Sequence, residues 1–137
     1  MDGGTYTLVL ERTGDDTLTV GALGAIDVPA GWYAYTGSAL GSGGFARLDR
    51  HRAVAAGEND TRHWHVDYLL GDDATHVERV VTTPAAIECG VARRLVGATD
   101  RTIPNFGCSD CDCRSHLVAD GDRETLLGAV ERAHERA

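Results

Sequence analysis

Residues 31–39 place two tyrosines where their hydroxyl groups could act on a phosphodiester. Tyr33 and Tyr35 alternate along a pattern typical of a β-strand, so both side chains point to one face of the sheet. A helical pattern follows a glycine-rich stretch and carries Arg47 and His51. An arginine offers a planar fork of donors to phosphate oxygens, and a tyrosine hydroxyl can position or deprotonate a water molecule. Aromatic alternation is also typical of core packing, so both interpretations stay open here.

The net charge of the chain limits how such a site can bind nucleic acid. The chain has 137 residues, of which 13 are basic and 21 acidic, and its formal net charge is −8. A protein of this charge does not bind nucleic acid non-specifically at ordinary salt concentrations, although a local basic cleft remains compatible with it. Every basic residue is an arginine, and aspartate outnumbers glutamate. This composition is typical of a protein from a salt-loving organism, in which concentrated salt screens the repulsion between carboxylates.

The length and hydropathy of the chain predict a single soluble domain, which we place at 1–137. No apolar run approaches the roughly 18 residues of a membrane span, so we expect no membrane contact. The residues at the N-terminus lack the basic and apolar segments of a secretory signal. We therefore expect a cytoplasmic protein whose cysteines are reduced, buried or bound to metal. Nothing in the sequence indicates an oligomeric state.

The pattern of apolar, β-branched and turn residues predicts an α+β fold. Pro84 is expected to begin the third helix, because proline is favoured in the first helical turn. We expect a small antiparallel or mixed β-sheet flanked by helices. The expected strands are 5–11, 17–20, 25–28, 32–37, 76–83 and 114–119, and the expected helices are 43–56, 63–70, 84–96 and a last one from 122 onwards.

Two short strings on the predicted strands carry a more specific signal. They are Gly4-Thr5-Tyr6 and Tyr35-Thr36-Gly37, and Arg47 and Glu88 follow them on two predicted helices. With these residues the chain resembles the GIY-YIG endonuclease superfamily. It is more closely similar, over nearly its full length, to an archaeal and bacterial branch called Uri-like and known mainly as a domain of unknown function. The strings that match this branch are Gly31 to Ala39, Arg47 with Arg50-His51, His63 to Leu69, Glu88-Cys89, and Phe106 to Leu117.

The resemblance implies metal-dependent hydrolysis of DNA phosphodiester bonds, in repair or structure-specific cleavage. Glu88 would hold Mg²⁺ or Mn²⁺, mostly through water molecules, and the ion would neutralise the scissile phosphate. Arg47 would stabilise the charge that develops on the phosphate, while Tyr6 and Tyr35 flank the attacking water. His51, one helical turn after Arg47, would accept the proton.

The same resemblance implies a GIY-YIG-like core with two additions. The strings Gly4-Thr5-Tyr6 and Tyr35-Thr36-Gly37 are the two half-motifs of the superfamily, and an extra hairpin at about residues 13–29 would separate them. A strand and a helix would extend the core at the C-terminal end.

Four further residues are expected to contact nucleic acid: Ser38, Arg50, His63 and His65. Ser38 stands where repair nucleases of the superfamily carry a lysine, and the other three lie in the matching strings. Plainer interpretations exist, since Arg50 also suits a solvated helix face and Glu88 suits a first-turn carboxylate that complements the helix dipole. A non-catalytic nucleic-acid-binding module of the same fold is therefore an alternative function.

A cluster of sulfur and imidazole side chains near the C-terminal end allows another alternative. Three thiolates and one imidazole can form a tetrahedral zinc site, which would make the chain a structural or regulatory zinc protein. All four ligands would come from one nine-residue span, whereas structural zinc sites usually join two separate chelating pairs. Buried small thiols near Glu88-Cys89 are the competing interpretation. The four candidate ligands are Cys108, Cys111, Cys113 and His116.

The acidic composition predicts that the fold becomes more stable as KCl rises towards molar concentration. Salt shortens the Debye length from about 10 Å at 0.1 M to about 3 Å at 1 M, which screens repulsion between the excess carboxylates. Thermal unfolding in a KCl series measures this directly. A melting temperature that stays constant or falls with KCl would contradict the halophilic interpretation.

Overall fold

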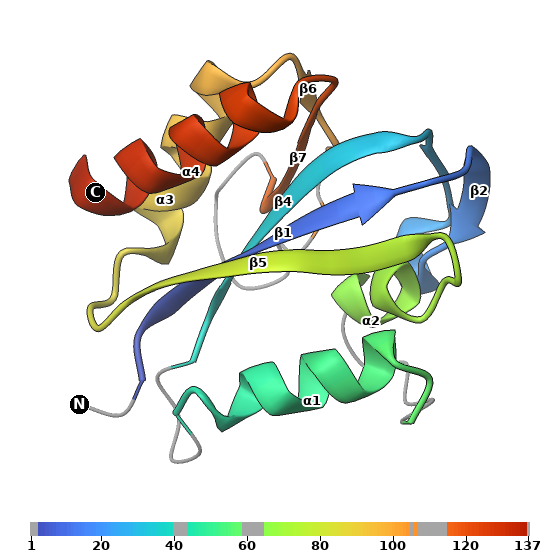
Figure 1. The fold of residues 1–137 in the computed structure, drawn as a ribbon, viewed down its shortest axis with the longest axis horizontal. Coiled ribbons are helices and arrows are strands. Elements are labelled where there is room, and N and C mark those ends of the chain that lie inside the picture. Colours follow the sequence, from blue (N-terminus) through green and yellow to red (C-terminus); the bar gives the residue numbers. More distant parts are fainter. Residues whose placement is uncertain (1–2, 40–43, 59–64, 105, 107–114, 137) are drawn as a thin grey trace.

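An antiparallel sheet of five strands separates two pairs of helices in the computed structural model of the chain (Figure 1). The structure describes residues 3–39, 44–58, 65–104, 106 and 115–136, apart from the side chains of Asp16, Ala22 and Arg47. The elements are β1 (Thr5–Arg12), β2 (Asp16–Thr19), the 3-10 helix η1 (Gly21–Leu23), β3 (Ala25–Val28), β4 (Gly31–Ser38), α1 (Ala46–Ala55), α2 (His65–Leu70), β5 (Thr75–Thr83), α3 (Glu88–Ala98), β6 (Arg101–Thr102), β7 (Leu117–Asp120) and α4 (Arg123–Arg136).

β1 and β4 lie at the centre of this sheet, whose strand order is β5-β1-β4-β7-β6 with antiparallel neighbours throughout. They pair along the whole of β1, beginning with Thr5 opposite Ser38. In this register Tyr6 lies directly opposite Gly37, so a glycine rather than a side chain stands beside the tyrosine ring. The predicted α+β class, with a mainly antiparallel sheet flanked by helices, is confirmed.

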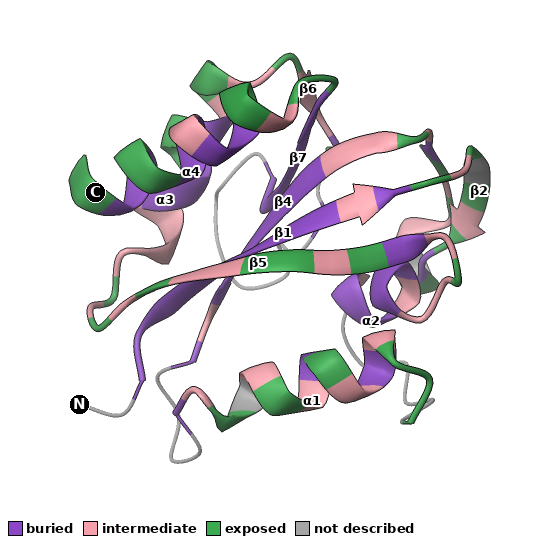
Figure 2. Ribbon diagram, viewed as in Figure 1, coloured by how far each residue is buried: buried purple, intermediate pink, exposed green. Residues whose placement is uncertain are grey.

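The two faces of the sheet carry separate hydrophobic cores, because side chains alternate along each strand. On one face, Tyr6, Leu8 and Leu10 of β1 pack with apolar residues of α1 and α2. On the other face, Val9 of β1 and Ala34 of β4 pack with apolar residues of α3 and α4. Figure 2 shows the result: β1 and most of β4 are buried, whereas the outer sides of α3 and α4 are exposed.

β2 and β3 follow β1 and precede β4 along the chain, and they form a separate two-stranded hairpin, as the sequence predicts. At its base lies the buried Arg12, whose guanidinium donates to the Val28 carbonyl at 3.0 Å, the Asp72 carboxylate at 2.8 Å and the Thr75 hydroxyl at 2.7 Å. These partners offset the cost of removing the cation from water. The arginine therefore ties the hairpin to β1 and to the turn ahead of β5.

The helix expected to begin at Pro84 begins instead at Glu88, and the reason lies in Thr5. The Thr5 hydroxyl donates to the Ala85 carbonyl at 2.8 Å and accepts from the Ile87 amide at 3.0 Å. This segment is thereby held against β1 in a non-helical bend. The preference of proline for a helix start is a weak local tendency, which the tertiary contact overrides.

Two predictions near the C-terminal end also need correction. The strand expected at 114–119 spans Leu117–Asp120, and a turn precedes it in which the Ser115 hydroxyl accepts from the Leu117 amide at 2.9 Å. β6 was not expected from the sequence, because a two-residue strand carries no periodic signal and exists only through its pairing with β7.

His134 joins α4 to a row of threonines on the sheet, of which Thr7 and Thr36 are buried and Thr83 is half-buried. Its Nε2 atom lies 2.8 Å from the Thr7 hydroxyl and its Nδ1 atom 2.8 Å from the Thr83 hydroxyl. The Thr7 hydroxyl in turn lies 3.0 Å from that of Thr36 on β4. Burial lowers the pKa of His134 below its ordinary value of 6.5, because the imidazolium would lose its hydration.

A pH-dependent contribution of His134 to stability follows from this shift. The unfolded chain protonates the imidazole below about pH 6.5 while the folded protein resists protonation, so the stabilisation is complete above that pH and is lost as the pH falls. His134→Gln should be less stable than wild type by about 1–2 kcal/mol at pH near 7.5, because hydrogen bonds are lost, and the difference should narrow towards about pH 5.5.

Urea unfolding at a series of pH values measures the difference between the two proteins. His76→Gln is the matched control, since it makes the same substitution at a histidine that is exposed on β5. A stability difference between wild type and His134→Gln that stays constant or widens at low pH would contradict the assignment.

Candidate functional site

Tyr6 and His51 form a buried hydrogen-bonded pair between β1 and α1. The Tyr6 Oη and His51 Nε2 atoms lie 2.7 Å apart, and the two residues are 1% and 0% exposed. Their ring centroids are 5.5 Å apart. A phenol donates to an unprotonated imidazole nitrogen in such a pair, so a proton can pass between the two side chains.

Tyr35 and Phe106 extend this pair into an aromatic group. The Tyr35 ring centroid lies 6.4 Å from that of Tyr6 and 6.0 Å from that of Phe106, and the His65 ring lies 5.6 Å from Phe106 on another side. Tyr6, Tyr35, His51 and His65, each singled out from the sequence, are thus brought together. Phe106 was not singled out as a site residue, although it begins one of the strings that carry the family resemblance.

Gly37 provides the space that the Tyr6 hydroxyl occupies. A Cβ atom at position 37 would overlap the Tyr6 hydroxyl and would lie 3.0 Å from its Cε2 atom. Only a residue without a side chain lets the tyrosine ring cross β4 at this point. The glycine of the second half-motif is therefore required by the tyrosine of the first.

Arg50 forms a two-pronged ion pair that links α1 to α2. Its Nη1 and Nη2 atoms each lie 2.9 Å from a carboxylate oxygen of Asp67, whose side chain is completely buried. The hydrogen bonds to Asp67 are the main reason that the pKa of Arg50 is raised above its ordinary value. A phosphate would have to compete with this carboxylate for the guanidinium fork, and nucleic-acid binding by Arg50 stays a prediction.

The other predicted residues are located less fully. Ser38 is the last residue of β4 and is half-buried, opposite Thr5. Arg47 lies in α1 one turn before His51, and its side chain is outside the described part of the chain. The predicted residues that fall entirely outside the described ranges are His63, Cys108, Cys111 and Cys113.

Glu88, Cys89 and His116 form a second group, at the start of α3 and just before β7. A carboxylate oxygen, the thiol sulfur and an imidazole nitrogen, one ligand atom from each residue, all lie within 4.8 Å of one another. Glu88 Oε2 lies 3.5 Å from His116 Nδ1, and the same nitrogen lies 3.0 Å from the Thr36 carbonyl oxygen. We call these three residues the Glu-Cys-His cluster.

The aromatic group and the Glu-Cys-His cluster lie on opposite faces of the sheet and meet at β4. Tyr6 faces α1 and α2, whereas Glu88 begins a helix that packs on the other face. The Thr36 carbonyl contacts His116 of the cluster, and the next residue, Gly37, borders the Tyr6 hydroxyl. Contacts from the cluster to the aromatic group run through the backbone of β4 and through the His116 amide, which donates to the Phe106 carbonyl at 2.8 Å.

Of the three donors in the cluster, only the Glu88 carboxylate suits the Mg²⁺ that the resemblance implies there. Mg²⁺ demands octahedral oxygen ligands and keeps several of its waters. A thiol and an imidazole beside the carboxylate are instead the ligands of Zn²⁺ and other transition-metal ions. The complete donor set thus favours a transition-metal ion, and Mg²⁺ at the Glu88 carboxylate stays a prediction.

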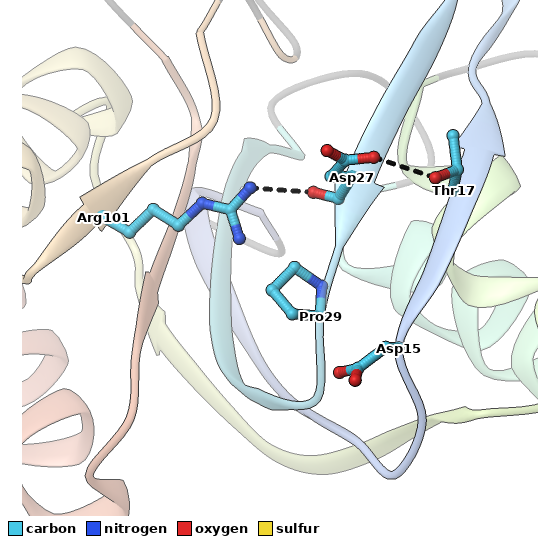
Figure 3. Close-up of a pocket in the computed structure, with 5 residues that line it drawn as sticks. All are labelled: Asp15, Thr17, Asp27, Pro29 and Arg101. Atoms are coloured by element: carbon cyan, nitrogen blue, oxygen red, sulfur yellow. Dashed lines mark hydrogen bonds between the residues drawn. The ribbon is translucent and has the colours of Figure 1, made fainter.

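A separate open hollow of about 650 Å³ lies beside the hairpin (Figure 3). Arg101 donates to the Asp27 carbonyl at 2.9 Å, and the Thr17 hydroxyl donates to the Asp27 carboxylate at 2.8 Å. These polar groups already bond to one another, so we assign no chemistry to the hollow. Its lining consists of Asp15, Thr17, Asp27, Pro29 and Arg101.

Within the described ranges of the chain, no helix is both long and apolar enough to cross a membrane.

Comparison with known proteins gives one match. Neither a curated protein nor a solved structure matches the sequence. A family model described as a domain of unknown function, DUF123, matches residues 5–137, which include both half-motifs from Thr5 onwards and the Glu-Cys-His cluster. The chain therefore belongs to the DUF123 family.

Proposed function

We propose that the chain is an endonuclease that hydrolyses phosphodiester bonds in DNA. The observation that carries the proposal is the buried hydrogen bond of 2.7 Å between Tyr6 and His51. A phenol that can pass its proton to a neighbouring imidazole is suited to take a proton from water, which is general-base chemistry. The resemblance of the two half-motifs to GIY-YIG nucleases supports the same assignment.

In this proposal the chemistry begins at the buried pair. His51 accepts the hydroxyl proton of Tyr6, and Tyr6 takes a proton from the water whose oxygen attacks phosphorus. The P–O bond to the leaving nucleoside oxygen breaks, and that oxygen takes up a proton from solvent. Tyr35 orients this water, since its ring lies 6.4 Å from that of Tyr6 and it is the more exposed of the two tyrosines, at 9%. Arg47 stabilises the negative charge that develops on the phosphate. Because two of the three donors in the Glu-Cys-His cluster are not Mg²⁺ ligands, no step is assigned to that ion.

The net charge narrows the choice of substrate. A protein with a formal net charge of −8 gains little from general attraction to the DNA backbone. Recognition then depends on local contacts and on the shape of the DNA, which favours branched or flapped structures over plain duplex.

Cleavage assays on fluorescently labelled branched, flapped and plain DNA test the proposal. They are best run in a KCl series, because the protein is expected to be most stable at high salt and to bind DNA most weakly there. Separate reactions contain Mg²⁺, Mn²⁺ or Zn²⁺. If the wild-type protein binds branched DNA but cleaves none of these substrates with any ion, the chain is the non-catalytic binding module instead.

Tyr6→Phe should lower the cleavage rate by about 10²–10⁴-fold, because it removes the proposed base while keeping the ring. Tyr33→Phe is the matched control: Tyr33 is also 1% exposed, and its hydroxyl donates to the Pro29 carbonyl at 2.6 Å, in the loop between β3 and β4. Both variants should lose similar stability, about 1 kcal/mol, through one hydrogen bond. Equal cleavage rates for the two variants would contradict the role of Tyr6.

Gly37→Ala should lower cleavage to a similar extent, because a Cβ atom at position 37 forces the Tyr6 hydroxyl away from His51. Gly97→Ala is the control, since nothing lies within 4 Å of a Cβ built at that helical position. That substitution should be neutral or stabilise the protein by up to about 1 kcal/mol. Full cleavage by a folded Gly37→Ala protein would show that the close approach has no catalytic purpose.

A further inference from the structure

We propose that Glu88, Cys89 and His116 bind a transition-metal ion, with Zn²⁺ as the preferred occupant. The inference stands independently of the nuclease proposal, since it concerns ligand chemistry on the other face of the sheet. The three residues come from two separate elements, the start of α3 and the segment just before β7. Their candidate ligand atoms lie within 4.8 Å of one another.

This spacing is close to what a bound ion requires. Zn²⁺ binds nitrogen and carboxylate oxygen at about 2.0–2.2 Å and thiolate sulfur at about 2.3 Å. Tetrahedral geometry then places neighbouring ligand atoms at roughly 3.3–3.8 Å from one another. Small rotations of half-buried side chains supply the remaining difference, and Glu88 and Cys89 are both half-buried.

The imidazole of His116 is held in the manner of a metal ligand. Its Nδ1 atom lies 3.0 Å from the Thr36 carbonyl oxygen, which can only accept a hydrogen bond. In the neutral ring this contact keeps the proton on Nδ1 and leaves the lone pair on Nε2, so Nε2 is the atom that binds the ion. Glu88 Oε2 lies 3.5 Å from Nδ1 without an ion, so the Glu88 side chain turns towards Nε2 when the ion binds. A backbone carbonyl that fixes the tautomer and the ring orientation is the usual outer partner of a ligating histidine.

The backbone around the cluster is also fixed by the fold. The Thr5 hydroxyl bonds to Ala85 and Ile87, directly ahead of Glu88 and Cys89. On the other side, the His116 amide donates to the Phe106 carbonyl at 2.8 Å, and the His116 carbonyl accepts from the Thr36 amide at 2.9 Å. The backbone that carries the three ligands is therefore positioned before any ion binds.

The degree of exposure distinguishes this cluster from a closed structural site. His116 is 3% exposed, whereas the Glu88 side chain is 29% exposed. Three protein ligands with one side open to solvent leave a fourth position for water or for an anionic group, as in catalytic zinc sites. Closed structural sites instead use four protein ligands.

Titration of the metal-free full chain with Co²⁺ tests the site, because Co²⁺ replaces Zn²⁺ and its thiolate bond gives a charge-transfer band in the near ultraviolet. Wild type should show the band, and added Zn²⁺ should remove it by displacing Co²⁺. Cys89→Ser should abolish the band, and Glu88→Gln should weaken Co²⁺ binding by at least ten-fold. His116→Gln is the less informative variant, because burial of this residue means that its loss can also disturb folding.

Two controls keep the test decisive. Cys111→Ser, made outside the described residues, should retain both the band and the affinity. Circular dichroism should show that Cys89→Ser and Glu88→Gln remain folded, as expected for half-buried positions. Retention of the band in Cys89→Ser with loss in Cys111→Ser would move the metal to the cysteines of residues 108–113 and overturn the proposal. Absence of Co²⁺ and Zn²⁺ binding by wild type would overturn it as well.

Discussion

The register between β1 and β4 is the constraint on which the rest of the structure depends. It places Tyr6 opposite Gly37, and the tyrosine hydroxyl reaches His51 on α1 only because no side chain stands at that glycine. A slip of one residue would turn every side chain of β1 to the other face of the sheet. Tyr6 would then lose its contact with His51 on α1, and Thr7 would lose its contact with His134 on α4.

Because side chains alternate along β1 and β4, this one pair of strands positions residues on both faces of the sheet. Their tyrosines face α1 and α2, while Thr5 and Thr36 take part in contacts that position α3 and β7. The Thr5 hydroxyl fixes the bend ahead of Glu88, and the Thr36 carbonyl fixes the imidazole of His116. The Thr5 hydroxyl, and the Thr36 hydroxyl that lies 3.0 Å from that of Thr7, make hydrogen bonds that an apolar β-branched residue would lack, whereas any residue at position 36 would offer the carbonyl.

Two arginines of this lysine-free chain, Arg12 and Arg50, form ion pairs that link separate elements of the fold. Arg12 and Arg50 both direct their guanidinium groups at aspartates, and Asp67 is completely buried beneath its pair. The planar fork satisfies several acceptors at once, which suits it to such sites better than an ammonium group. Removal of one partner would leave a charge buried in the protein, so these pairs hold α1, α2 and the hairpin in place.

The sequence by itself determined the α+β class, the hairpin between the half-motifs and most of the strand positions, because alternation and turn residues act over a few neighbours. It also identified Tyr6, Tyr35, His51 and His65, which the fold brings into one group. Only the tertiary structure decided where α3 begins, that Arg50 meets Asp67, and that Cys89 and His116 lie beside Glu88. These features join residues far apart in the chain, and such contacts depend on strand register and helix packing, which local periodicity does not encode.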